Sequence, residues 1–307
     1  MSVQIYQKRR SIKSFLFEKF LAYRKTKEHF SSIENTTEFV NQVGRQNVTP
    51  YDLGDMVFSS DIQEGFFEGM KYFTLNDQQS TKQRVILYIH GGAWTNQPLK
   101  YHWEFMDNMA QALHAKVIAP IYPKVPHFNY KNTYPTLVNL YKKVLETVES
   151  PRKLILMGDS AGGNIALGLA HLLKMHHIPQ PKDIILLSAC VDMVLDNPEI
   201  PEFEKKDPML SRAGMEVITQ IWAGDKNLKD PLISPIYGDF KGLGKITQFI
   251  GTREGLYPDA MLLKGKLKRQ GIDMNTFIYP KMNHVFVIMP IPEAKDAQQK
   301  IIDVINS

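Results

Sequence analysis

The sequence contains very little cysteine: Cys190 is the only one among 307 residues, so no disulfide can form within the chain. A lack of disulfides is typical of proteins from a reducing compartment. Long apolar runs are also lacking, because none reaches the roughly 18–20 residues that a membrane-spanning helix needs. The apolar stretch 14–23 is interrupted by Glu18 and Lys19, and no small-residue cleavage site follows it. We therefore expect a cytoplasmic protein without stable membrane insertion.

The sequence also lacks the ligand clusters that hold metal ions. Of its nine histidines, His176 and His177 adjoin, and adjacent positions cannot share one face of the helix that they end. Five others lie in expected helices or loops without a partner motif: His29, His102, His114, His127 and His171. We expect neither a metal nor a cofactor.

Positive charge is concentrated near the N-terminus. Residues 1–28 hold eight basic and two acidic side chains, a net charge of +6, whereas the whole chain carries +5, which leaves −1 for the rest. Because no basic face extends beyond this segment, we do not expect nucleic-acid binding.

The apolar residues of this basic segment fall at helical spacing: Ile12, Phe15, Leu16, Phe20 and Tyr23. Such a helix can pack on the protein body with its charged side in water, or it can lie on an anionic membrane surface. We favour packing on the body, because amphipathic helices are usually parts of a folded domain.

From about residue 68 onward, short apolar runs alternate with helical patterns. The expected strands are 84–89, 116–122, 153–157, 183–189, 246–251 and 274–279, and the expected helices are 130–149, 161–175, 256–270 and 292–305. This alternation predicts an α/β protein with a central, mainly parallel sheet and helices on both faces.

Two regions interrupt the alternation. Residues 1–65 precede the first clear strand, and residues 191–240, rich in proline and aspartate, separate two strands. We expect an N-terminal lid segment at 1–65 and a catalytic domain at 66–307. A cap is expected within that domain at about 191–240, with a helix near 211–222.

The strand at 153–157 leads into Gly158-Asp159-Ser160-Ala161-Gly162, after which a helix begins. A sharp strand-to-helix turn of this kind lifts a serine hydroxyl out of the sheet, and glycines let strand and helix crowd together. The N–H of Ala161, at the start of the helix, can face a developing oxyanion. The pattern indicates Ser160 as a nucleophile, although a plain turn can have the same composition.

The strand at 84–89 leads into His90-Gly91-Gly92-Ala93-Trp94. A Gly-Gly turn after a strand exposes successive backbone N–H groups, which can stabilise the charge of a tetrahedral intermediate. Two such turns in this order favour a catalytic site over two unrelated turns. We expect Gly91 and Gly92 to be oxyanion donors and His90 to hold their loop by hydrogen bonds.

Together, HGGAW and GDSAGGN resemble the hormone-sensitive-lipase-like group of carboxylesterases, which have the α/β-hydrolase fold. The segments YPKVP (122–126) and DPLISP (230–235) add to this resemblance, which runs from about residue 68 to the end. Three residues depart from the group: Ala93 replaces a third glycine, Ile121 a frequent aspartate and Cys190 a frequent aromatic residue. An alanine suits the loop if its φ is negative.

In this fold the triad follows the order serine, acid, histidine. The resemblance implies that the base is His284, just after the last expected strand, and that the acid is Glu254, just after the strand at 246–251. Asp259 is the alternative acid, although it falls inside the next expected helix. The expected site comprises the triad Ser160, Glu254 and His284 and the oxyanion donors Gly91, Gly92 and Ala161.

The expected function is hydrolysis of a small-molecule ester with a short, acetyl-like acyl group through an acyl-enzyme. An amidase or peptidase on the same triad is one alternative, which matched ester and amide substrates would separate. A non-catalytic ligand-binding protein of this fold is another, which labelling by a fluorophosphonate would exclude. A homodimer is left open.

Overall fold

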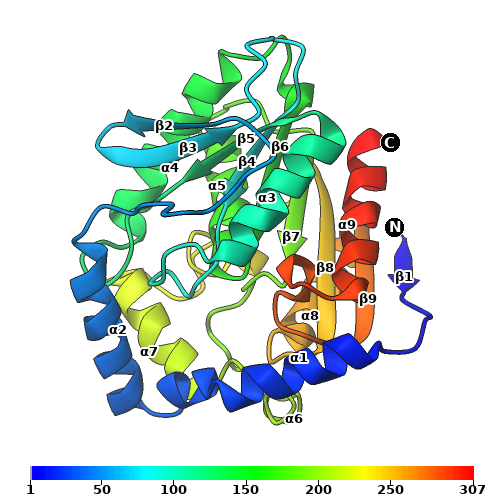
Figure 1. Ribbon diagram of the computed structural model, residues 1–307. Helices are drawn as coiled ribbons and strands as arrows, with labels where there is room; N and C mark the ends of the chain where they lie inside the picture. The colour runs from blue at the N-terminus through cyan, green and yellow to red at the C-terminus, as the bar shows by residue number, and fades with distance from the viewer. Residues whose placement is uncertain (1) are drawn as a thin grey trace.

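The computed structural model describes residues 2–307, and its centre is one nine-stranded sheet with the order β1-β9-β8-β7-β6-β4-β5-β3-β2 (Figure 1). The strands are β1 (Val3–Ile5), β2 (Ile62–Phe67), β3 (Met70–Leu75), β4 (Val85–Ile89), β5 (Lys116–Pro120), β6 (Leu154–Asp159), β7 (Asp183–Leu187), β8 (Lys245–Arg253) and β9 (Met274–Asn283). Within the described residues, only β3 runs against the others, because its pairings with β2 and β5 are antiparallel. The loops that follow β4, β6, β8 and β9 therefore emerge at the same edge of the sheet.

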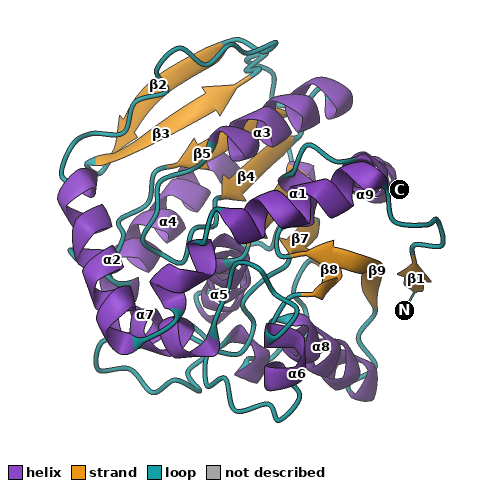
Figure 2. Cartoon of the chain, turned by 60° about the horizontal axis from the view of Figure 1, so that its bottom comes forward, coloured by secondary structure: helices purple, strands orange, loops and turns teal. Residues whose placement is uncertain are grey.

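Helices cover both faces of the sheet (Figure 2). One face carries α3 (Lys100–Leu113) and α9 (Pro292–Asn306), and the other carries α4 (Tyr130–Leu145), α5 (Ala161–Met175) and α8 (Tyr257–Arg269). The side chains of β4 alternate between the two cores: Ile86 and Tyr88 point into the first, and Val85, Leu87 and Ile89 into the second. The central strands are thus buried on both sides, as a parallel sheet requires.

The remaining helices lie outside these two layers: α1 (Ile12–Tyr23), α2 (Ile33–Asn47), α6 (Ile200–Glu204) and α7 (Arg212–Ala223). Figures 1 and 2 both show α2 beside α7, so the N-terminal segment meets the segment inserted between β7 and β8. Their contact is close, because a Cβ added at Gly214 of α7 would lie 2.5 Å from the Cα of Phe30.

The predicted α/β fold is confirmed, and the six expected strands correspond to β4–β9. The expected helices at 161–175 and near 211–222 correspond to α5 and α7. The sequence pattern does not indicate β1, the β2–β3 hairpin or α3. The edge strand β2 has no buried residue and no apolar run, and α3 has no Ser or Asp at its start. Instead, the backbone N–H of Leu99 donates to Nδ1 of His102 at 2.9 Å.

The expected boundary of the N-terminal lid at residues 1–65 needs correction. Val3–Ile5 pairs with β9 in parallel, with Val3 opposite Thr276, and Ile62–Phe67 is strand β2. Both ends of the segment therefore belong to the sheet, and only the residues between them lie outside it.

The expected orientation of the basic helix is wrong. In α1 the apolar residues Ile12, Leu16 and Tyr23 are exposed to solvent, whereas the polar residues Ser14 and Glu18 are buried. The helix packs on the protein body with the side that carries Ser14, Glu18 and Leu21, so the apolar residues of the other side face water. Within residues 2–307, no helix has both the length and the apolar character needed to cross a membrane.

Lys124, in the loop after β5, is an amine buried inside the fold, with 5% of its surface exposed. Its Nζ donates to the carbonyl oxygen of Tyr122 at 2.9 Å and lies 4.5 Å from the centroid of the Tyr122 ring. No carboxylate forms an ion pair with it among the described residues, and burial lowers its pKa from 10.5 to about 7. The unfolded chain therefore binds this proton more tightly than the folded chain does.

We expect Lys124→Met to raise the free energy of unfolding at pH 7, because it keeps the side-chain volume and removes a buried amine. Between pH 7 and 10 the unfolded wild type holds more protons than the folded one, so wild-type stability rises with pH relative to the variant. The slope is at most about 1.4 kcal/mol per pH unit. Urea unfolding of both proteins across this range measures it, and a constant difference would contradict the depressed pKa.

Candidate active site

Ser160 occupies a strained turn between β6 and α5, with φ of +51°. The turn is tight because α5 begins directly against β4: a Cβ added at Gly162 would lie 2.0 Å from the carbonyl oxygen of Ile89. A side chain at that position would push the helix away from the sheet. The sequence pattern thus has a steric cause, and it places the Ser160 hydroxyl at the carboxyl edge of the sheet.

The three residues predicted to form a triad lie in one continuous hydrogen-bonded array. Nε2 of His284 is 2.8 Å from Oγ of Ser160, and Nδ1 of His284 is 2.7 Å from Oε2 of Glu254. The hydroxyl of Ser188 and the backbone N–H of Gly251 both donate to Oε1 of Glu254 at 2.8 Å. Both oxygens of this fully buried carboxylate are occupied, so its orientation toward the imidazole is fixed.

The alternative acid, Asp259, does not reach this array. It lies in the first turn of α8, where its Oδ1 accepts a hydrogen bond from Nδ2 of Asn197 at 2.7 Å. Burial raises the pKa of Asp259 to about 7. Between the two carboxylates, the geometry favours Glu254 as the partner of His284.

The expected oxyanion loop needs one correction. The backbone N–H of Gly91 donates to Oδ1 of Asp159 at 2.9 Å and is therefore unavailable to a substrate. In the part of the chain that the structure describes, the N–H groups of Gly92 and Ala93 have no acceptor, and both residues line the cavity at Ser160. The available donors are thus Gly92 and Ala93, with Ala161 at the first turn of α5.

Ala93 also differs from expectation in its backbone, because its φ is +53° and not negative. A left-handed alanine costs about 1–2 kcal/mol, so neighbouring packing must hold it in place. The next residue, Trp94, anchors the loop. Its side chain is fully buried and stacks on the ring of Trp222, with 5.8 Å between the ring centroids, and its carbonyl oxygen accepts a hydrogen bond from the N–H of Val125 at 3.0 Å.

A buried polar network around Asp159 supports the oxyanion loop. Its Oδ1 accepts from the hydroxyl of Tyr88 at 2.6 Å as well as from Gly91, and its Oδ2 lies 3.1 Å from Nε2 of His102. Burial alone would raise the pKa of Asp159, but the charge and hydrogen bond of His102 and the other donors hold it below its ordinary value. The sequence alone does not indicate this partner of His102, because Asp159 is remote in the chain.

His90 has the role expected from the sequence. Its Nδ1 lies 2.6 Å from the carbonyl oxygen of Gly91, and its ring stacks on Tyr122 at 4.6 Å. Burial and the nearby charges of Lys124 and His102 hold the pKa of His90 well below its ordinary value. A neutral His90 therefore fixes the loop and has no contact with Ser160.

A second carboxylate, Asp207 from the inserted segment, acts on His284 through its charge. It is buried, and its Oδ2 accepts a hydrogen bond from the N–H of Gly255, next to Glu254, at 3.0 Å. Burial on its own would lower the pKa of His284. The hydrogen bond and charge of Glu254, together with the charge of Asp207, outweigh burial and raise it above the ordinary value.

The cavity at Ser160 has a volume of about 640 Å³. The loop after β4 and the loop carrying His284 form its floor, while Leu21, Phe30, Phe39 and Met215 from the N-terminal and inserted segments form its roof. Among residues 2–307, no three His, Cys, Asp or Glu side chains are arranged to hold a metal ion. The arrangement offers a nucleophile, a base with its carboxylate, and oxyanion donors within a mainly apolar cavity.

Comparison with known proteins agrees with this chemistry. A family profile described as an alpha/beta hydrolase fold matches residues 86–288. An esterase of Acinetobacter venetianus is 28% identical over 232 residues, which cover 75% of this chain and 77% of the relative. An acetyl-hydrolase of Streptomyces hygroscopicus is 25% identical over 203 residues, 66% of this chain and 68% of that protein. A solved Staphylococcus aureus structure, to which esterase activity is ascribed, has a TM-score of 0.86 and 29% identity over 91% of this chain and 96% of that one.

We expect Glu254→Gln to lower kcat for p-nitrophenyl acetate by about 10²- to 10⁴-fold, because an amide no longer stabilises the imidazolium. Asp259→Asn is the matched control and should change kcat little. Steady-state rates of the two folded variants on this ester test the assignment. If Asp259→Asn lowered kcat strongly and Glu254→Gln left it unchanged, the acid of the triad would be Asp259.

The charge of Asp207 should appear in the pH dependence. His284 must be neutral to accept the proton of Ser160, so kcat/KM falls on the acid side as the imidazole becomes protonated. Asp207→Asn removes a charge that raises the pKa of His284, and the acid limb should therefore move to lower pH. A kcat/KM profile from pH 5 to 9 measures the shift, with Asp259→Asn as the control. If the acid side of the kcat/KM profile did not move, the charge of Asp207 would not raise the pKa of His284.

Proposed function

Since the chain belongs to the hormone-sensitive-lipase-like esterases of the α/β-hydrolase family and is a carboxylic ester hydrolase, we propose that it cleaves short-chain acyl esters through an acyl-enzyme on Ser160. The observation that carries this proposal is the unbroken path of hydrogen bonds from Ser160 through His284 to Glu254.

The two half-reactions use the same groups. Oγ of Ser160 attacks the ester carbonyl while Nε2 of His284 takes its proton, and Glu254 stabilises the resulting imidazolium. The N–H groups of Gly92, Ala93 and Ala161 donate to the oxyanion. His284 then protonates the leaving alcohol and, in the second half-reaction, takes a proton from the water that attacks the acyl-enzyme.

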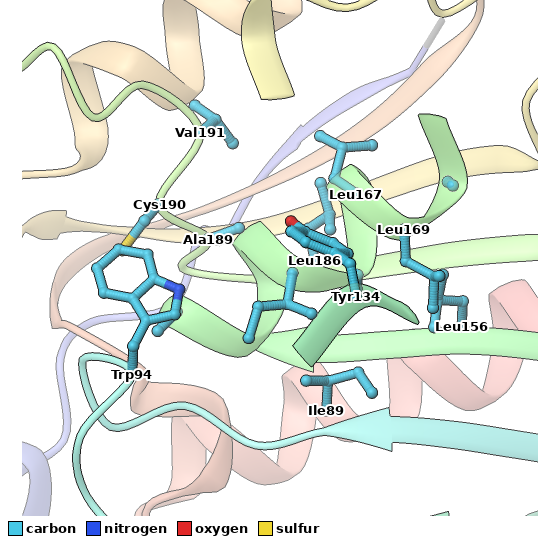
Figure 3. Packing of buried hydrophobic residues seen from close by; sticks show 14 of the residues in the cluster. Ile89, Trp94, Tyr134, Leu156, Leu167, Leu169, Leu186, Ala189, Cys190 and Val191 are labelled. Atoms are coloured by element: carbon cyan, nitrogen blue, oxygen red, sulfur yellow. The ribbon is translucent and has the colours of Figure 1, made fainter. Parts of the chain in front are cut away.

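Packing next to the nucleophile supports a short acyl group. Sγ of Cys190 lies 3.9 Å from Oγ of Ser160, and Cys190 is fully buried. Figure 3 shows Cys190 with Trp94 and Ala189 among the buried residues of one core cluster. None of these three side chains lines the cavity at Ser160, so the packed core on this side of Ser160 limits the length of an acyl chain. The wider cavity extends instead toward α1 and the inserted segment, where it can take the alcohol part of a substrate.

The N-terminal and inserted segments act together as the roof of this cavity. Residues between β1 and β2 supply Leu21, Phe30 and Phe39, and residues 191–240 supply Leu210 and Met215. The rest of the chain forms the catalytic body. Because the roof is built from two segments that pack against each other, it confines the substrate on the side away from the sheet.

The acyl-length dependence of kcat/KM tests the proposal on p-nitrophenyl esters from acetate to palmitate. Each methylene that fits should add about 0.8 kcal/mol of binding, and carbons beyond the filled site should cost about 1–3 kcal/mol in strain. We therefore expect a maximum between acetate and butyrate. A maximum at laurate or longer would overturn the short-acyl proposal.

Ser160→Ala is the control for the nucleophile. We expect it to lower kcat by about 10³-fold or more and to abolish labelling by a fluorophosphonate, while circular dichroism shows an intact fold. Full activity in a folded Ser160→Ala protein would overturn the assignment of Ser160.

A further inference from the structure

Helix α1 exposes apolar side chains along its outer side. Ile12 is 79% exposed, Leu16 59% and Tyr23 83%, and Phe15 and Phe20 are each 46% exposed. These five residues form the outer apolar face of α1. Single exposed apolar residues are ordinary on a protein surface, but five on one helix form a contiguous patch that is normally covered by something else.

The inner side of α1 holds the helix in this orientation through polar contacts. The N–H and hydroxyl of Ser11 donate to the two carboxylate oxygens of buried Glu293 at 2.6 and 2.9 Å. Glu18 forms ion pairs of 2.8 Å with Arg10 and with Arg253, the residue before Glu254. Rolling the helix to bury its apolar face would strand these charges, so the exposed face is a fixed feature of the fold.

Basic side chains border the outer apolar face, and one of them, Lys19, lies within it. Lys8, Arg9, Lys13, Lys19 and Arg24 are exposed, and none forms an ion pair among residues 2–307. Nζ of Lys19 lies 5.5 Å from the centroid of the Phe15 ring. Because the opposite side of α1 is held by the protein body, only this exposed side is available to a membrane, where its apolar side chains can enter the interface and its cations can meet anionic headgroups.

The outer apolar face is continuous with the mouth of the catalytic cavity. Phe20 belongs to this face and also lines the cavity. Arg24, one helical turn further along, lines the cavity too. Figure 1 shows α1 running across one end of the molecule, below β8 and β9, and Figure 2 shows it from that end. A surface that covers α1 would therefore lie next to the entrance of the site.

We propose that the outer apolar face of α1, with its bordering cations, docks the protein on an anionic lipid surface and holds the cavity mouth against it. The charge decides between a lipid surface and a second copy of the chain. A twofold dimer through α1 would bring two sets of unpaired cations together, whereas anionic headgroups neutralise them at about 1 kcal/mol per residue. This interaction goes beyond ester hydrolysis and does not depend on the acyl preference.

The test is co-sedimentation of the full chain with vesicles of phosphatidylcholine alone or mixed equally with phosphatidylglycerol. We expect binding to the anionic vesicles only, and weaker binding as salt rises from about 50 to 500 mM. Lys13→Gln with Lys19→Gln should weaken binding about 30-fold. Ile12→Ser, Leu16→Ser and Tyr23→Ser together should weaken it at least about tenfold.

The matched control is Val57→Ser with Met175→Ser, two residues that are 95% and 66% exposed away from α1. It should bind like the wild type, and all variants should keep full activity on dissolved p-nitrophenyl acetate, so that a failure here is separable from a failure of the catalytic proposal. Absence of binding to anionic vesicles, or equal binding by wild type and α1 variants, would overturn the proposal. So would a wild-type dimer, seen by sedimentation velocity, that the α1 variants disrupt.

Discussion

The buried carboxylate of Glu254 is the point on which the catalytic geometry depends. Its Oε2 is hydrogen-bonded to Nδ1 of His284. Its Oε1 accepts hydrogen bonds from the hydroxyl of Ser188 and the N–H of Gly251. These donors come from the ends of three neighbouring strands, so the carboxylate ties the carboxyl edge of the sheet together. Because a buried charge is tolerated only with its hydrogen bonds complete, any change that misplaces one of these strands also misplaces the imidazole.

Two other buried carboxylates fix the oxyanion loop and helix α1. Asp159 fixes the oxyanion loop by taking the N–H of Gly91, and this leaves the next two N–H groups free for the substrate. Glu293 fixes α1 by accepting from Ser11 and Ser14, and the outer apolar face of that helix is exposed as a result. In each case a buried charge determines which groups are exposed: N–H groups in the cavity, and apolar side chains on the surface.

Much of the fold and of the site could be predicted because the signals are local. The alternation of strands and helices follows from the spacing of apolar residues, and the elbow at Ser160 from glycines that only a crowded turn requires. The positions of Glu254 and His284 just after strands place both at the same edge of a parallel sheet. No such signal exists for β2, none of whose residues is buried, or for α3, whose start is capped by the ring of His102.

By itself, then, the sequence determined the α/β-hydrolase fold and the side chains available for chemistry. The tertiary structure decided which backbone groups remain free, since the acceptor that removes Gly91 from the oxyanion loop lies far along the chain. It also decided which side of α1 faces the protein. Helical spacing shows which residues share a face, but the direction of that face is set by charges on remote elements, here Glu293 and Arg253.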